Sequence, residues 1–138
     1  MYNEFDSLLE EETTIDSWYD DGFLIAQDIL KQFSEKDWKL LINNVSNKDI
    51  EWQMKLAYCI DNQIIVEELQ VIEKLMSSND IELWKMCIDA LRVFDNELGY
   101  EYVRKHPDII TEIKKRNEQL GAVEQRIFND FIEKFSSY

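Results

Sequence analysis

The segment between Asp37 and Phe94 contains nearly the same pattern of residues twice, at an offset of 31 residues that rises to 32. A period of this length is typical of a unit of two antiparallel helices repeated along the chain. Because one helical pair cannot bury its apolar stripe alone, we expect neighbouring pairs to stack on each other. The matching positions are Asp37–Leu41 with Glu68–Ile72, Val45–Ser46 with Met76–Ser77, Asp49–Glu51 with Asp80–Glu82, Trp52 with Trp84 and Met54 with Met86.

The rest of the chain predicts further helices that close the ends of this stack. A composition of 45% hydrophobic residues with one proline and three glycines favours helices over a turn-rich sheet. We therefore predict an all-α fold of stacked antiparallel helical hairpins, with about seven to nine helices and no sheet. The 138 residues are enough for a single domain that needs no metal or disulfide. Its expected parts are an acidic N-terminal cap (1–33), the tandem two-helix repeats (34–95) and the C-terminal helices (96–138).

Apolar spacing and capping residues predict individual helices. Ser34 and Asp37 resemble a capping box that starts a helix ending near Val45. Residues 23–33 form one expected helix and residues 123–135 another, each with apolar residues at four-residue spacing. The expected inward stripe of the first helix is Ile25, Ile29 and Phe33, with Ala26 and Leu30 beside it. That of the second is Val123, Ile127, Phe131 and Phe135, flanked by Phe128 and Ile132.

Cys59 and Cys87 each lie among apolar residues on the second helix of a repeat. We expect them to be buried free thiols that pack as small hydrophobic side chains. The first residues lack the basic start and apolar core of a signal peptide, and no apolar run approaches the length of a membrane span. We expect a cytoplasmic protein with no membrane contact.

The formal net charge of −14 limits the possible partners. Residues 1–103 hold 23 acidic and 8 basic side chains, whereas residues 104–138 hold 6 acidic and 7 basic ones. A chain this acidic is repelled by phosphate backbones, so direct nucleic-acid binding is not expected. A basic protein surface is a suitable partner, because complementary fields speed encounter. The alternative is that the charge serves solubility alone.

Two surfaces are candidates for a binding role. Residues 1–21 carry eight carboxylates, no basic residue and several aromatic side chains, which fits either an interface or a cap on the first repeat. The second helices of the repeats leave a narrow polar ridge for solvent, which fits either a binding ridge or a solvated face. The candidate binding residues are Glu10, Glu11, Glu12, Asp16, Trp18, Tyr19, Asp20 and Asp21 in the first surface, and Glu51, Tyr58, Glu82 and Asp89 in the second.

No motif for catalysis or cofactor binding stands out in the sequence. The single histidine, His106, is near no cysteine in sequence, and the three glycines are isolated from one another. Carboxylate pairs that share a helix face are common in a chain with 29 acidic residues. We therefore expect no enzymatic activity, no cofactor and no bound metal.

The tandem segment resembles a degenerate HEAT-type helical repeat. The resemblance is carried by Trp38, Asp49-Ile50-Glu51-Trp52, Ala57, Asp80-Ile81-Glu82, Trp84 and Ala90-Leu91. A small, very acidic, all-helical chain of this kind is similar to the immunity proteins of bacterial contact-dependent growth inhibition and related polymorphic toxin systems, over about residues 20–135.

This resemblance implies a cytosolic protein that binds the C-terminal domain of its cognate toxin, often a nuclease, and blocks the active site. Nuclease domains carry basic clefts because they bind phosphate backbones, and an acidic inhibitor matches such a cleft electrostatically. A ribonuclease toxin is the favoured partner. The alternative is a HEAT-like scaffold or adaptor that binds another partner without inhibiting it.

Overall fold

The computed structural model describes residues 1–11 and 17–136, and within these ranges it contains nine α-helices and no strand. The predicted all-α fold is therefore confirmed. The chain divides into two compact units, Met1–Val93 and Phe94–Tyr138, here called unit 1 and unit 2.

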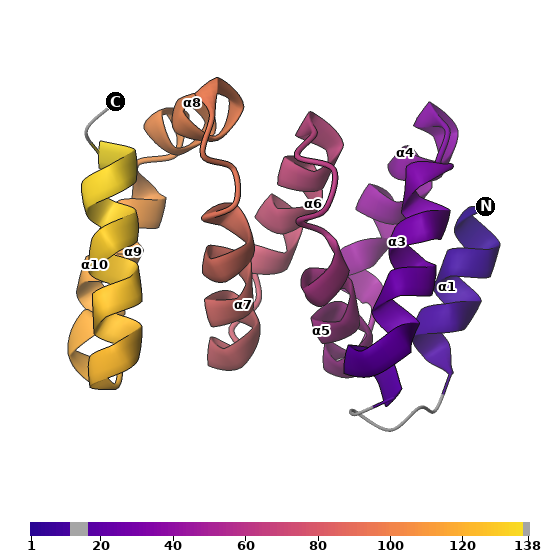
Figure 1. Ribbon diagram of the computed structural model, residues 1–138, viewed down its shortest axis with the longest axis horizontal. Coiled ribbons are helices and arrows are strands. Elements are labelled where there is room, and N and C mark those ends of the chain that lie inside the picture. Colours follow the sequence, from indigo (N-terminus) through magenta and orange to yellow (C-terminus); the bar gives the residue numbers. More distant parts are fainter. Residues whose placement is uncertain (12–16, 137–138) are drawn as a thin grey trace. The chain divides into compact units, whose positions relative to one another are not determined.

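Unit 1 is a stack of three helical hairpins, which Figure 1 shows side by side from α1 to α7. The first helices of the hairpins (α1, α4 and α6) contact one another in order, and so do the second helices (α3, α5 and α7). A short π-helical segment, η1 (Trp18–Gly22), leads directly into α3. The helices are α1 (Tyr2–Glu10), α3 (Phe23–Lys31), α4 (Glu35–Asn44), α5 (Ile50–Cys59), α6 (Val66–Met76) and α7 (Ile81–Leu91).

Equivalent residues cap the equivalent helices of the two repeats. The Asp49 carboxylate accepts a hydrogen bond from the backbone N–H of Trp52 at 2.9 Å, at the start of α5. Asp80 accepts one from the backbone N–H of Leu83 at 3.0 Å, at the start of α7. Such caps satisfy N–H groups that have no partner inside the helix. The offset between Asp49 and Asp80 matches the repeat seen in the sequence.

The predicted capping box at the start of α4 is also present. Ser34 Oγ accepts a hydrogen bond from the backbone N–H of Asp37 at 3.2 Å, and the Asp37 carboxylate accepts one from the backbone N–H of Ser34 at 3.0 Å. A reciprocal pair of this kind fixes the point at which a helix begins.

The core of unit 1 lies between the two layers of helices. Cys59 and Cys87 are buried free thiols within it, as the sequence predicts. The expected inward position of Ile25 is wrong, because this side chain is 54% exposed. Ala26 and Leu30 form the buried side of α3 instead, and the small Ala26 side chain permits a close approach of the neighbouring helices. The other main core residues are Trp52, Leu56, Ile60, Leu69, Ile72, Trp84, Ile88 and Leu91.

Unit 2 contains α8 (Glu97–Lys105), α9 (Asp108–Arg116) and α10 (Ala122–Ser136). α10 packs on both α8 and α9, with Phe128, Phe131 and Phe135 buried. The expected inward position of Val123 is wrong, since its side chain is 74% exposed. Residues spaced by four drift about 40° around a helix at each step, so a stripe that is inward at Phe131 has turned toward solvent by Val123.

Candidate functional site

Two adjoining hollows open on unit 1, one of about 500 Å³ and one of about 720 Å³, and both include Tyr19 and Met54. We call the two hollows together the acidic groove. The end of α1, η1 and the first half of α5 form the first hollow, and η1, α3, α5 and α7 form the second. The lining residues of the first hollow are Leu9, Glu10, Glu11, Trp18, Tyr19, Asp49, Glu51, Trp52, Met54 and Lys55. Those of the second are Tyr19, Phe23, Gln27, Met54, Ala57, Tyr58, Asp61, Glu82, Met86, Asp89 and Ala90.

Two partly exposed tyrosines stand in the acidic groove. The rings of Tyr19 and Tyr58 have centroids 4.4 Å apart, and Phe23 meets Tyr58 edge-on at 5.0 Å. Tyr19 is 41% exposed and Tyr58 is 39% exposed. Packing against each other and against Phe23 limits the rotamers of these rings, so they lose little freedom when a partner covers them. Aromatic side chains of this kind are common anchors in protein interfaces.

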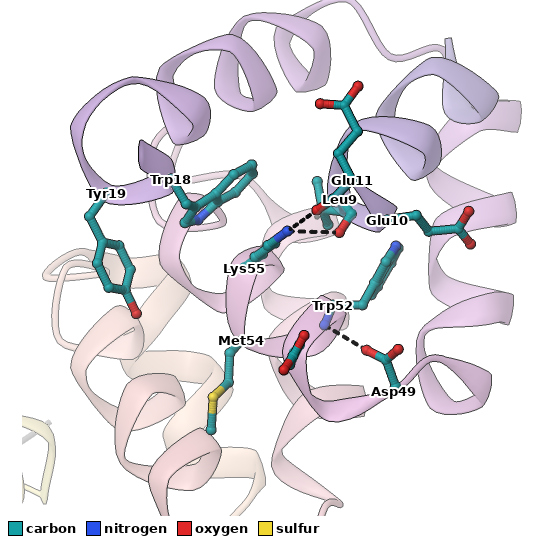
Figure 2. Close-up of a pocket in the computed structure, with 10 residues that line it drawn as sticks. Leu9, Glu10, Glu11, Trp18, Tyr19, Asp49, Trp52, Met54 and Lys55 are labelled. Carbon is teal, nitrogen blue, oxygen red and sulfur yellow. Dashed lines mark hydrogen bonds between the residues drawn. The ribbon is translucent and has the colours of Figure 1, made fainter. Parts of the chain in front are cut away.

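Lys55 fixes the wall of the first hollow. Its ammonium group donates hydrogen bonds to the backbone carbonyls of Leu9 at 3.1 Å and Glu11 at 2.8 Å, at the C-terminal end of α1. Figure 2 shows the Lys55 side chain reaching between Trp18 and these carbonyls, with its nitrogen 5.4 Å from the centroid of the Trp18 ring. The positive charge of Lys55 is therefore directed at the negative end of the α1 dipole, which it stabilises.

The groove concentrates negative charge. Seven carboxylates line it, and Lys55 is the single cation among the described lining residues. Three of the carboxylates have a cationic neighbour just outside the groove: Glu10 with Lys48 at 3.3 Å, Glu82 with Lys85 at 3.3 Å and Asp89 with Arg92 at 2.6 Å. In the part of the chain that the structure describes, Glu11, Glu51 and Asp61 form no ion pair.

Asp61 and Asp89 place two carboxylates in the second hollow. Burial raises the pKa of the Asp61 carboxyl, and the charge of Asp89 raises it further. Asp89 already pairs with Arg92, and a further cation beside Asp61 would offset part of the cost of burying that carboxylate. The second hollow is therefore electrostatically prepared for a positively charged group.

The structure brings together most of the residues that we named from the sequence. Asp20 and Asp21 are exposed on η1 and line neither hollow. Glu12 and Asp16 lie outside the described residues. Trp18 lines the first hollow but is only 2% exposed, so it supports Lys55 while Tyr19 offers the accessible ring. The candidates that line the acidic groove are Glu10, Glu11, Trp18, Tyr19, Glu51, Tyr58, Glu82 and Asp89.

Several groove residues were missed by sequence reasoning. Asp49 was interpreted only as part of the repeat pattern, although its carboxylate both caps α5 and lines the first hollow. Asp61 follows the end of α5, where no periodic pattern indicates its orientation. Met54 was named as the repeat position that matches Met86, and it lies at the junction of the two hollows. The repeat itself was the available signal, because Met54 and Met86 are equivalent and both line the second hollow.

The fold and the groove together define an all-helical repeat protein whose unit 1 carries an acidic groove with exposed aromatic side chains. Within residues 1–11 and 17–136, no three His, Cys, Asp or Glu side chains are grouped so as to hold a metal ion. None of the described helices combines the length and the apolar character that crossing a bilayer requires. Comparisons with protein-family models, with curated proteins and with solved structures gave no match.

Proposed function

We propose that this chain is an immunity protein that binds a cationic toxin domain in its acidic groove. The observation that carries the proposal is the combination of unpaired carboxylates with an exposed tyrosine pair. Glu11, Glu51 and Asp61 supply charge that no neighbouring cation balances, and Tyr19 and Tyr58 supply apolar contact area. Complementary charge accelerates encounter, while buried aromatic anchors slow dissociation.

A nuclease domain, and a ribonuclease in particular, is the proposed partner. Its cleft must bind a phosphate backbone and is therefore lined by Lys and Arg. Carboxylates docked in that cleft occupy the positions of the phosphates, so substrate is excluded without any chemistry by the inhibitor. This mechanism requires only binding from the chain.

Co-expression with a toxin fragment tests the proposal. An immunity role predicts that the gene lies directly behind the C-terminal coding region of a large secreted protein. The fragment is the C-terminal domain of that protein, and the readout is growth of the producing cells. The wild-type chain should restore growth. A double charge reversal in the groove, Glu51→Lys with Glu82→Lys, should abolish the rescue. With the purified proteins it should slow association at least about tenfold, because steering is lost.

A matched control variant distinguishes the effect of charge in the groove from the effect of the net charge. Glu35→Lys with Glu73→Lys changes the net charge equally, but both residues are exposed on first helices and lie outside the groove. This control should rescue growth as the wild type does. Equal loss in both variants would remove the groove from the mechanism. Tight binding without rescue would instead favour the scaffold function.

A further inference from the structure

The outer side of the hairpin formed by α1 and α3 carries a hollow of about 440 Å³ that is lined by both apolar and polar side chains. α1 turns Tyr2, Phe5 and Leu9 into unit 1, and Leu8 lies at the flank of this buried stripe, about 90° around the helix, where it is partly exposed. α3 buries Ala26 and Leu30, and this leaves Ile25 and Ile29 outward. We call this surface the end face. Its lining residues are Asn3, Glu4, Ser7, Leu8, Glu11, Ile25 and Ile29.

The end face combines exposed apolar side chains with carboxylates. Here Ile25 is 54% exposed, and Leu8 and Ile29 are partly exposed. Ile25 and Ile29 are four residues apart on α3 and face Leu8 across the hollow, an arrangement that accepts the apolar ridge of another helix.

The charge around the end face indicates which kind of partner can bind there. Glu4 and Glu11 line the hollow, and Lys31, in the last turn of α3, is the one lysine or arginine of α1 and α3 and does not line it. A second copy of the same face would bring these carboxylates against each other. A helix with Lys and Arg beside its apolar stripe would instead pair with them. Glu11 also lines the first hollow of the acidic groove, so the two surfaces are contiguous.

We propose that the end face is a docking surface for a cationic amphipathic helix of a protein partner, which packs as an additional helix on the stack. This surface extends the interface around the end of α1. The proposal goes beyond the neutralisation of a toxin, because a cationic helix of any partner protein would dock in the same way.

A synthetic amphipathic peptide tests the proposal. The probe is an 18-residue peptide of Leu and Lys with an apolar stripe at helical spacing, labelled with a fluorophore, and the readout is fluorescence anisotropy at moderate ionic strength. The control peptide has the same composition in scrambled order. The patterned peptide should bind the wild-type chain at least about tenfold more tightly, because only it buries an apolar stripe. Equal binding of both peptides would overturn the proposal.

Single and double variants of the chain show where the patterned peptide binds. Ile25→Ser should weaken binding of the patterned peptide about tenfold, and Glu4→Gln with Glu11→Gln should weaken it further at low salt. Val66→Ser changes a comparably exposed apolar residue on α6, outside the end face, and should leave binding unchanged. Circular dichroism would confirm that each variant is folded.

Two results would contradict the inference. Binding that is lost in Tyr58→Ala and retained in Ile25→Ser would place the peptide in the acidic groove. Self-association that Ile25→Ser abolishes, measured by sedimentation, would identify a second copy as the occupant. The growth assay with Glu51→Lys and Glu82→Lys reports on the acidic groove alone, so failure of either proposal is distinguishable from failure of the other.

Discussion

At the residue scale, Glu68 stabilises the loop that connects α5 to α6, between the two repeats. Its carboxylate is fully buried and accepts hydrogen bonds from the backbone N–H groups of Asn62 at 3.2 Å, Gln63 at 3.0 Å and Ile65 at 3.3 Å. Ile64 between them has a φ of 59°, a left-handed conformation that is unfavourable for a β-branched residue. The carboxylate therefore holds a strained loop in place.

Glu68→Ala should lower the free energy of unfolding of unit 1 by about 3 kcal/mol, because it leaves three backbone N–H donors of the loop without their acceptor. Urea titration followed by tryptophan fluorescence measures this, since all four tryptophans lie in unit 1. Glu67→Ala, at the neighbouring and more exposed position, serves as the control and should change stability by less than about 0.5 kcal/mol. Similar losses in the two variants would show that the buried hydrogen bonds contribute little.

At the scale of elements, the repeat makes Asp49 and Asp80 equivalent. Each accepts one hydrogen bond from the first turn of its helix. Asp49→Ala and Asp80→Ala should each reduce stability by about 1 kcal/mol, and the double variant by the sum, because the two caps share no partner. Thermal or urea unfolding measures both effects. Asparagine at either position retains the cap and should restore most of the loss, so an equal defect in Asp49→Asn would argue against capping as the cause.

The helices were predictable from the sequence because periodicity and caps are local. The repeat placed α4 to α7, and Ser34 with Asp37 marked the start of α4. The rotation of a helix about its own axis was less predictable, as Ile25 and Val123 show. α3 is apolar around much of its circumference, so its inward side depends on how closely α1 and α5 approach it. That distance is a property of the packed unit.

At the scale of the whole molecule, only part of the candidate site could be predicted from the sequence. Aromatic and acidic residues at Tyr19, Glu51 and Tyr58 indicated an interface, and the structure gathers them in one groove. Asp61 was missed because its role depends on Asp89, which only the pairing of α5 with α7 brings near. Long-range pairing of this kind leaves no signal in either helix alone.

Two partly or fully buried carboxyl groups predict that the free energy of unfolding rises on mild acidification. Burial raises the pKa of both Asp61 and Glu68, so the folded chain binds protons at these sites more tightly than the unfolded chain. Their contribution is complete below the unfolded pKa and is lost as the pH rises through the folded pKa. The free energy of unfolding should therefore increase as the pH falls from neutral toward the unfolded pKa values of about 4.

Below about pH 4 the stability should fall again, because the backbone N–H of Ser34 lowers the pKa of Asp37 and protonation breaks that contact. Urea titrations across this range measure the profile. Asp61→Asn should flatten the rise between neutral and mildly acidic pH. Glu73→Gln, which removes the same charge from an exposed position, should retain the rise; equal profiles for the two variants would attribute the rise to general repulsion.

The two cysteines give unit 1 a built-in reporter. Burial raises the pKa of both thiols, that of Cys87 to about 12 and that of Cys59 further. Because alkylating reagents attack the thiolate, neither side chain reacts while the helices around it stay closed. Modification of these sulfurs therefore measures how often unit 1 opens. Unit 2 has no cysteine, so its own opening leaves no trace in the same experiment.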